Sequence, residues 1–547
     1  MQIIVMVNMI KLSSKYLDEY WIKRSLKLNC SKKFLSYPEP YEIGNVENGK
    51  LLLSGVLKFQ VEFIEIPNNS IWNVENKSIK LKNYLEGFDW LNDLAAVGSF
   101  EALKLAQDWV FEWILSDKEN QEHEWGLETL TRRLFSWISH SGFLLKTQNL
   151  TLSQSYIESI EQQAFFLEKR WKSLQSNIVR FKALVLLISV GIYIDNKNYL
   201  IRYSSDALDK EIRNSFDSDG GVYSRDPNIL SQIFSLLTWA EILLKKIEFN
   251  LTENHRSIIL KSAPILRSLR HSDGSLLGFR GKTELPKKYL DRALINSGVK
   301  YNVPKREIMG YARLGRKNIS IFIDTGGQLD SVTDGNFLDT KSAIEITIKK
   351  FPFIVSGSKV NDTEVSLGGV GNKVYNNSAL KLENKFENSV SLQPANLEWI
   401  ESKTDTILIA SHSGYLLETG LTQTRMIKLN NDETQITGED SFNAISEDSK
   451  FKFENIFRNN KKNGIKMSLN FLLHPEVGVD LGKDSVNFSL NNGERYSLSF
   501  SNKCHVEIEQ SEYYEELNGK RSATKQVVLS SYLMNYDNIM NWSITKF

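Results

Sequence analysis

The spacing of apolar residues changes near residue 300, and this change limits the folds open to the chain. Before it, apolar residues recur every three or four positions, as in the set Tyr156, Ile160, Ala164, Leu167 and Trp171. This period predicts helices that bury one face. Several such stretches follow one another with short polar connections, so we expect an all-α array in which neighbouring helices pack antiparallel.

After residue 300 the period becomes two. Residues 344–348 alternate between isoleucine and polar residues, and the same alternation appears over 467–473. Residues 486–490 run into Asn491-Asn492-Gly493, and the alternation resumes at Tyr496, which predicts a β-hairpin. Many strands without intervening helices predict a large antiparallel sandwich.

A length of 547 residues fits two or three domains. We predict an α+β chain with an N-terminal extension over residues 1–90, packed on a helical domain over 91–300, and a sandwich domain over 301–547. The stretch 51–66 is strand-like, and residues 181–194 form a nearly all-apolar helix.

Composition excludes several classes of protein. The net charge of +1 gives no broad field for nucleic acid or an anionic membrane. The two cysteines, Cys30 and Cys504, have neither metal-site nor disulfide-framework spacing. Residues 1–10 are apolar but lack the basic leader of a signal peptide, and the apolar run 183–194 is too short to cross a bilayer. We therefore expect no integral membrane segment.

Residues 219–227, Asp-Gly-Gly-Val-Tyr-Ser-Arg-Asp-Pro, join a glycine-rich turn to a helix start. Gly220 and Gly221 would let the backbone approach a ligand closely. Asp226 is a candidate N-cap, and Pro227 takes the favoured first helical position. Tyr223 and Arg225 would lie on the loop before this helix, where functional residues often occur. The alternative is a capped connection between helices.

Eight short motifs occur in the order of one known family. The motifs are Gly87-Phe88-Asp89-Trp90-Leu91-Asn92-Asp93-Leu94, Thr131-Arg132-Arg133-Leu134 with Trp137-Ile138-Ser139-His140, Asp219-Gly220-Gly221 through Pro227, His271-Ser272-Asp273-Gly274, Gly310-Tyr311-Ala312-Arg313-Leu314, Ser411-His412-Ser413-Gly414-Tyr415, Gly438-Glu439-Asp440 and Leu473-His474-Pro475-Glu476-Val477. With them, the chain resembles the heparinase II/III family of polysaccharide lyases, in particular its bacterial members.

This resemblance implies an incomplete α/α toroid followed by a β-sandwich, with a carbohydrate cleft between them. It also implies β-elimination on an acidic, uronate-containing polysaccharide, a location in the cell envelope or periplasm, and no cofactor. Because the C5 proton is hardly acidic beside a charged carboxylate, such an enzyme needs donors for that carboxylate. It also needs a base and an acid within hydrogen-bond reach.

Four residues are candidates for proton transfer: Tyr223, Tyr311, His140 and His412. Tyr311 lies where the chain enters the sandwich, and a core tyrosine is its alternative reading. His140 ends a predicted helix, where a histidine is often a favourable cap. His412 lies in a turn that contains serine and glycine, and we expect it to project from a sheet edge.

Five residues are candidates for substrate binding: Asn177, Arg133, Arg225, Tyr415 and Arg425. Asn177 resembles the family asparagine that contacts the uronate carboxylate, and a helix N-cap is its alternative reading. Arg133 lies seven residues before His140, so both can lie on one helix face and bind an acidic sugar. The tryptophans between 90 and 171 offer either sugar-stacking faces or core packing.

The chain also departs from the family. No histidine occurs between His271 and His412, although many relatives have one at the start of the strand that we align with 337–348. A second expected histidine is missing over 375–389, and Gln423 stands near Arg425 where another is expected. Some relatives hold a structural zinc in the sandwich, and histidines this sparse predict no metal site.

Three functions therefore stay open: an active lyase, a degenerate relative that binds acidic glycans without cutting them, and a cytoplasmic scaffold. The sequence does not determine the polysaccharide, endo or exo cleavage, or the oligomeric state.

Overall fold

The computed structural model describes thirteen stretches of the chain, namely residues 15–30, 33–75, 77–120, 125–146, 150–280, 286–300, 305–326, 342–357, 377–382, 394–459, 464–501, 503–515 and 520–547. Contacts between residues divide the chain into two compact units. The helical unit comprises Met1–Asp217, Gln232–Leu260 and Asp291–Gly298. The sandwich unit comprises Ser218–Ser231, Lys261–Leu290 and Val299–Phe547. The limits 1–90, 91–300 and 301–547 stay a prediction.

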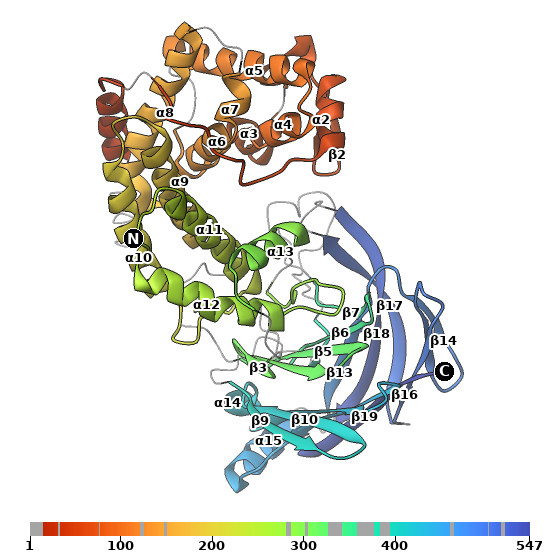
Figure 1. Ribbon diagram of the computed structural model, residues 1–547. Helices are drawn as coiled ribbons and strands as arrows, with labels where there is room; N and C mark the ends of the chain where they lie inside the picture. The colour runs from red at the N-terminus through yellow and green to blue at the C-terminus, as the bar shows by residue number, and fades with distance from the viewer. Residues whose placement is uncertain are drawn as a thin grey trace. The chain divides into compact units, whose positions relative to one another are not determined.

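The helical unit is built from helices in series, drawn from red to yellow-green in Figure 1, with one small hairpin near its start. Its elements are α2 (Val46–Leu53), β1 (Val56–Phe59), β2 (Glu62–Glu65), η1 (Pro67–Asn69), η2 (Ile71–Asn73), α3 (Ile79–Glu86), α4 (Trp90–Val97), α5 (Phe100–Asn120), α6 (Leu127–Ser139), α7 (Ser141–Leu144), α8 (Leu150–Arg170), η3 (Trp171–Ser173), α9 (Asn177–Tyr193) and α10 (Tyr199–Ser215). Three further helices contribute residues to both units: α11 (Pro227–Lys246), α12 (Glu253–Ser268) and α13 (Lys287–Asn296).

Local sequence explains where several of these helices begin. Asn45 accepts hydrogen bonds from the N–H groups of Glu47 and Asn48 at the start of α2, at 2.8 and 3.2 Å. Ser78 caps α3 in the same way. The all-apolar stretch predicted over 181–194 is the buried part of α9. The strand character predicted for 51–66 is confirmed only in part. Residues 51–53 end α2, and the β1–β2 hairpin begins after them.

An aromatic cluster fills the first part of the helical unit. The ring of Phe88 lies 5.1–5.8 Å from the rings of Trp72, Trp90, Trp113 and Trp137. Trp90, Trp113 and Trp137 have no exposed surface. Core packing, rather than sugar stacking, therefore explains these three tryptophans.

In its described residues, the sandwich unit contains three antiparallel sheets. The first has the order β3-β4-β5-β6-β7, the second the order β17-β18-β13-β8, and the third the order β14-β15-β16-β19-β12-β11-β10-β9. Two short helices, α14 (Leu416–Thr419) and α15 (Glu447–Asn459), lie in the connections. The strands are β3 (Glu307–Ile308), β4 (Tyr311–Gly315), β5 (Ile319–Asp324), β6 (Ile344–Ile348), β7 (Phe351–Ile354), β8 (Leu380–Leu382), β9 (Asn396–Glu401), β10 (Asp405–His412), β11 (Thr422–Asn430), β12 (Gln435–Asn443), β13 (Ile465–Leu472), β14 (Gly478–Leu481), β15 (Val486–Ser489), β16 (Arg495–Phe500), β17 (His505–Glu515), β18 (Lys520–Leu533) and β19 (Asp537–Lys546).

One hydrophobic core joins all three sheets, with buried residues such as Ile346 from β6, Leu469 from β13 and Ile544 from β19. The predicted change from helices to an antiparallel sandwich is therefore confirmed. The predicted hairpin over 486–500 is β15–β16, and its turn contains Gly493 at a φ of 82°. The strand indicated by the alternation over 344–348 is β6, and all five of its residues are buried, including the polar Glu345 and Thr347.

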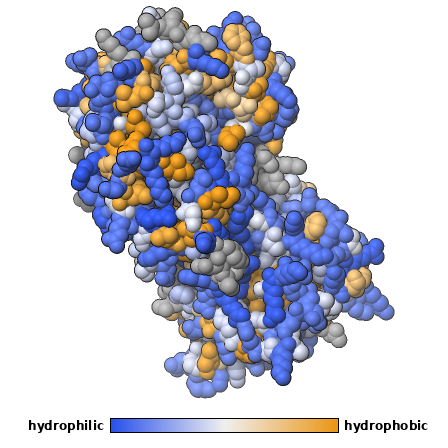
Figure 2. Space-filling model, in the orientation of Figure 1, coloured by the Kyte–Doolittle hydropathy of each residue, from blue (hydrophilic) through white to orange (hydrophobic). Residues whose placement is uncertain are grey.

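Within the described residues, α11 alone is long and apolar enough to cross a membrane, and 83% of that stretch is buried inside the protein. Such burial is typical of a core helix in a globular unit. On the face drawn in Figure 2, apolar residues are mixed with hydrophilic ones.

Candidate functional site

The glycine-rich stretch predicted as a loop is a turn that leads directly into α11. The N–H of Asn228 donates to the Asp226 carboxylate at 2.8 Å, and Pro227 is the first residue of the helix. The predicted helix start is therefore confirmed. Residues 218–231 belong to the sandwich unit, which also contains β4 and β5.

Gly220 is required by a neighbouring helix. Its φ is +96°, and a Cβ built on it would lie 2.5 Å from the Cβ of Lys261 on α12. Ser262 donates its hydroxyl to the Gly220 carbonyl at 2.7 Å, and the Lys261 ammonium donates to the Ser218 carbonyl at 2.9 Å. The sequence predicted that a ligand would approach the backbone of these glycines closely, but at Gly220 it is α12 that does so.

Tyr223 occupies the tip of a tight turn. The N–H of Arg225 donates to the carbonyl of Val222 at 2.9 Å, which closes the turn around Tyr223 and Ser224. The Tyr223 side chain is 57% exposed. Of the four proton-transfer candidates, it is the one that presents its side chain to solvent.

The Arg225 side chain lies in a socket made by the segments on either side of β4–β5. Its guanidinium donates to the carbonyls of Met309 and Gly310 at 3.0 and 2.7 Å, and to the Asp324 carboxylate at 2.5 Å. A Cβ on Gly310 would lie 2.5 Å from Arg225 Nε, and one on Gly326 would lie 1.7 Å from its Cζ. The two glycines therefore make room for the guanidinium.

Tyr311 is part of the same assembly. Its side chain is buried, and its hydroxyl donates to the main-chain carbonyl of Arg225 at 2.7 Å. The Arg225 guanidinium lies 5.0 Å from the centre of the Tyr311 ring, which stacks on Phe279. Burial raises the pKa of Tyr311 well above the usual range of a phenol, although Arg225 opposes this shift.

His271, which belongs to one of the family motifs but was not among the site candidates, lies in this unit as well. His271 contacts the Ser320 hydroxyl through Nδ1 at 3.0 Å and the Glu345 carboxylate through Nε2 at 3.1 Å. The N–H of Gly278 also donates to Glu345. This explains why β6 is buried on both faces, because Glu345 has its hydrogen-bond partners inside the protein.

In the helical unit, Asn177 is the first residue of α9, and Ser176, not Asn177, takes the N-cap position. The Asn177 amide donates to the Ser215 hydroxyl at 3.0 Å. One turn further along α9, Arg180 pairs with Glu211 at 3.4 Å and keeps 32% of its side chain exposed. Arg180 is a candidate that was missed, although its i+3 spacing from Asn177 is visible in the sequence.

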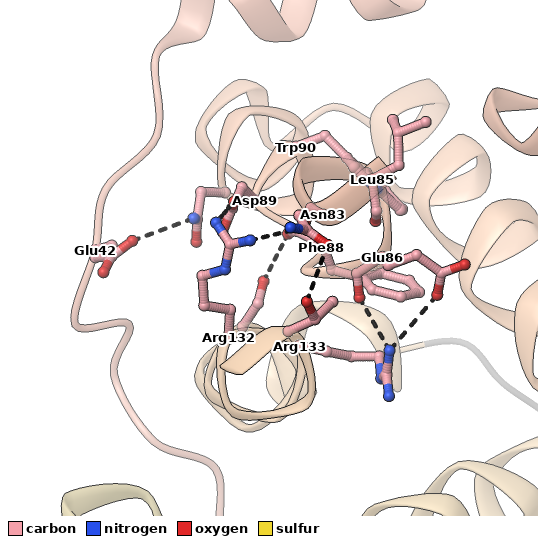
Figure 3. Close-up of polar contacts among 12 residues, drawn as sticks. Glu42, Asn83, Leu85, Glu86, Phe88, Asp89, Trp90, Arg132 and Arg133 are labelled. Carbon is pink, nitrogen blue, oxygen red and sulfur yellow. Dashed lines mark hydrogen bonds and ion pairs between the residues drawn. The ribbon is translucent and has the colours of Figure 1, made fainter. Parts of the chain in front are cut away.

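Arg133 lies inside the helical unit, as Figure 3 shows. It has no exposed surface and pairs with Glu86 at 3.6 Å. It also donates to the side chain of Gln163 at 2.8 Å, and it lies 4.4 Å from the ring centre of Trp113. These contacts account for the guanidinium within the core of the unit.

His140 follows the last residue of α6, as predicted, and is buried. Its Nε2 contacts the side-chain oxygen of Asn92 at 2.7 Å. Burial lowers the pKa of His140 to about 4, so its imidazole is neutral at neutral pH. The partners of Arg133 and of His140 are different residues, and the two side chains share no hydrogen-bond partner among those described above.

The three candidates of β10–β11 lie inside the sandwich. His412 and Tyr415 are buried, and their rings lie 6.4 Å apart. Arg425 donates to the Asp440 carboxylate at 2.6 Å, and both side chains are fully buried. The sequence placed His412 at a sheet edge, but the β10 strand pairs with β9 on one side and β11 on the other.

The donors near this position do not fit the zinc site of some relatives. Gln423, a neutral amide, pairs with His412 across β10 and β11, and the Nδ1 atom of His412 accepts the N–H of Gly414 at 3.2 Å. Across the stretches that the structure describes, no group of three histidine, cysteine or carboxylate side chains is arranged to hold a metal ion.

Comparisons with known proteins agree with this architecture. Residues 376–543 match the family model described as heparinase II/III-like, C-terminal. A heparinase III structure is 13% identical, with a TM-score of 0.66 over 97% of this chain and 89% of that chain. A mutant heparan sulfate lyase from Pedobacter heparinus is also 13% identical, with a TM-score of 0.60 over 97% of this chain and 88% of that one.

A chondroitin AC lyase from Streptomyces coelicolor A3, solved with chondroitin sulphate, is 9% identical, with a TM-score of 0.51 over 92% and 79% of the two chains. No curated protein matches the sequence. At these identities the structural likeness shows the fold, and the sequence match identifies the C-terminal domain. Residues 376–543 are thus identified as a heparinase II/III-like C-terminal domain, and the fold of the chain is that of heparinase III and related lyases.

Proposed function

We propose that this protein is a polysaccharide lyase that cleaves a uronate-containing polysaccharide by β-elimination, with Tyr223 as the proton-transfer residue. The observation that carries the proposal is the exposed phenol of Tyr223 at the tip of a turn that is held on both sides. The fold supports it, because similar solved structures include a heparan sulfate lyase and a chondroitin AC lyase.

The chemistry requires a proton to be moved twice. In β-elimination the C5–H bond and the C4–O bond break, a C4=C5 double bond forms, and the leaving oxygen gains a proton. A phenolate on the ring face that carries the leaving oxygen takes the C5 proton and passes it to that oxygen. One exposed tyrosine can therefore serve both steps.

Two carboxylates in this part of the sandwich unit, Asp226 and Asp324, are engaged by other residues of the protein, and this favours elimination over hydrolysis. A glycoside hydrolase uses a pair of carboxyl groups on either side of the scissile bond. Here Asp226 accepts from the first turn of α11, and Asp324 holds Arg225. Both carboxylates therefore have structural partners.

For the uronate carboxylate, the best candidates are Asn177 and Arg180 in the first turn of α9. An amide and a guanidinium one turn apart are suited to a carboxylate. Arg180 is paired with Glu211 but keeps 32% of its side chain exposed, whereas Arg133, Arg225 and Arg425 are paired with carboxylates and are at most 12% exposed, so we assign these three no substrate contact. That Asn177 and Tyr223 contact one sugar stays a prediction.

The test uses the purified full chain and a panel of heparan sulfate, chondroitin sulfate, hyaluronan and alginate. Elimination creates an unsaturated uronate end, whose ultraviolet absorbance is followed with time. We expect Tyr223→Phe to lower kcat by about 10²–10⁴-fold. Tyr532→Phe, at a tyrosine of β18 that is 54% exposed, is the matched control and should leave kcat unchanged.

A second function, glycan binding without cleavage, is favoured by the burial of His140 and His412. With these imidazoles inside the protein, Tyr223 has no exposed histidine among the sequence candidates to assist it. Binding to an acidic polysaccharide without a rise in absorbance would support this function. If the protein binds none of these polysaccharides, a role as a scaffold, the third function left open by the sequence, replaces both proposals.

We also propose a location in the bacterial cell envelope, where a lyase for extracellular polysaccharide meets its substrate. Fractionation of cells that express the native gene would test this, and recovery in the cytoplasmic fraction would contradict it.

A further inference from the structure

We propose that Arg225 and Asp324 are positioning residues that hold Tyr223 in its reacting position. The inference rests on the proposed role of Tyr223 and deepens it, because it explains how an exposed phenol on a loop is kept in one place.

The backbone of Arg225 is held in an uncommon conformation. Its φ is 54°, in the left-handed region that residues other than glycine seldom adopt. Such a conformation is strained and persists where the surroundings enforce it. In this position the Arg225 N–H closes the turn onto Val222, and Tyr223 becomes the tip of that turn.

Both polar groups of the Arg225 main chain are engaged. The N–H donates to Val222 at 2.9 Å, and the carbonyl accepts the Tyr311 hydroxyl at 2.7 Å. Since Tyr311 begins β4, the second bond ties the turn to the first sheet of the sandwich unit. The main chain two residues after Tyr223 is therefore fixed from two directions.

The side chain adds a third attachment. The guanidinium reaches three acceptors, at Met309, Gly310 and Asp324, and two of them are main-chain carbonyls. Asp324 is buried and also lies 4.0 Å from Arg280. A planar fork fits this set of acceptors, whereas a lysine ammonium cannot reach all three with the same geometry.

The glycines on either side make the socket specific for this arrangement. A methyl group on Gly326 would overlap the guanidinium carbon, at 1.7 Å from it. Gly326 also donates its N–H to Asp324 at 3.1 Å, so the same residue admits the guanidinium and orients the carboxylate.

These attachments have a consequence for catalysis. A reacting group that is misplaced by about 1 Å can lose roughly 10² in rate, even when the substrate still binds. Loosening the Arg225 socket should therefore lower kcat through Tyr223 and leave KM nearly unchanged.

Three variants test this at a temperature well below unfolding: Arg225→Lys, Asp324→Asn and Gly326→Ala. We expect each to lower kcat by about 10–100-fold, with KM within about twofold of the native value. The control is Asp18→Asn, which removes another close arginine–carboxylate pair, Arg170–Asp18 at 2.5 Å in the helical unit. It should leave kcat unchanged.

The double variant Tyr223→Phe/Arg225→Lys separates positioning from a general structural effect. If Arg225 acts through Tyr223, the double variant is no slower than Tyr223→Phe alone. Additive losses, or a rise in KM without a fall in kcat, would overturn the proposal.

A readout that needs no activity completes the test. A 3-fluorotyrosine at position 223 should give one sharp fluorine resonance in the otherwise native chain, and a broadened or shifted one in Asp324→Asn. An unchanged resonance would overturn the positioning role. A native chain that cleaves no substrate but shows this change would reject the lyase proposal and keep the positioning role.

Discussion

Tyr311 and Arg225 hold each other in place. The Tyr311 hydroxyl donates to the Arg225 carbonyl at 2.7 Å, and the Arg225 guanidinium lies 5.0 Å from the centre of the Tyr311 ring. The contact joins residues that are 86 positions apart in the sequence. It makes Tyr311 a support for the turn that carries Tyr223, and it leaves the Tyr311 hydroxyl without the exposure that a reacting phenol needs.

Replacing Tyr311 by phenylalanine should therefore destabilise the fold first. The change leaves the Arg225 carbonyl without its donor, and a buried acceptor left unpaired costs about 1–3 kcal/mol. Urea unfolding measures the loss, with Tyr532→Phe as the exposed control. If Tyr311→Phe unfolds like the native chain but eliminates no polysaccharide, Tyr311 is the reacting residue after all.

The neighbouring arginines of α6 should respond differently to the same substitution. Arg133 is fully buried beside Glu86, whereas the Arg132 side chain is 36% exposed and pairs with Asp89 at 3.1 Å (Figure 3). Arg133→Met leaves the buried Glu86 carboxylate without its positively charged partner, although Trp113 still donates to it, and we expect a cost of roughly 3 kcal/mol. Arg132→Met removes a half-exposed pair and should cost about 1 kcal/mol.

Thermal unfolding and urea titration of the two variants check this difference. Equal losses would contradict it. A loss of glycan binding by Arg133→Met, without any loss of stability, would restore the sugar-binding role that the sequence suggested for Arg133.

The structural features that the sequence predicted correctly are those that depend on residues close together in the chain. The start of α11 at Asp226 and Pro227 and the β15–β16 hairpin follow from local turn and capping chemistry, and both are confirmed. The change of apolar period likewise predicted the helical and sandwich parts correctly.

What the sequence could not provide depends on distant partners. The socket of Arg225 is made by Gly310, Asp324 and Gly326, which are 85 to 101 positions away, and no local pattern connects them. Similarly, the seven-residue spacing of Arg133 and His140 suggested a shared sugar-binding face, but it did not show that both side chains are buried. Burial of a charged group is set by the partner that neutralises it.

A third prediction concerns Glu433 and the β4–β5 turn. Its carboxylate accepts the N–H groups of four consecutive residues, from Arg316 to Ile319, at 2.8–3.3 Å. Such a row of N–H groups forms a concave site for an anion. Glu433→Gln removes the charge, and we expect a loss of about 1.5–3 kcal/mol in unfolding free energy.

The control for this variant is Glu447→Gln, because Glu447 pairs with Lys450 on the exposed surface of α15. It should cost less than about 0.5 kcal/mol. Hydrogen exchange gives a local check, since the amide protons of 316–319 should lose protection in Glu433→Gln. Equal stability of the two variants would show that the charge on Glu433 contributes nothing to the turn.

A fourth prediction concerns pH and two groups near the segment before α2. Burial raises the pKa of Asp93 to about 6, although the N–H of Asn45 donates to it at 2.6 Å and opposes the shift. Burial lowers the pKa of His140 to about 4. A carboxyl with a raised pKa contributes stability at low pH that is lost as the pH rises through about 6. A histidine with a lowered pKa contributes stability at high pH that is lost as the pH falls from about 6.5 to 4.

The contributions of Asp93 and His140 to the free energy of unfolding oppose each other between about pH 4 and 6.5. Together they should therefore make this free energy depend only weakly on pH in that range.

Asp93→Asn removes the contribution of Asp93 and keeps a side-chain oxygen that can accept from Asn45. We expect this variant to be more stable than the native chain at pH 8, by on the order of 1–2 kcal/mol, and to lose that advantage progressively as the pH falls from about 6 to below 3.8. Its stability should then fall more steeply than that of the native chain as the pH is lowered from 6.5 to 4, because the loss from His140 is no longer offset by Asp93. Urea unfolding at half-unit pH steps measures both curves, and an Asp93→Asn variant that is less stable than the native chain at pH 8 would show that the ionised Asp93 carboxylate stabilises the fold.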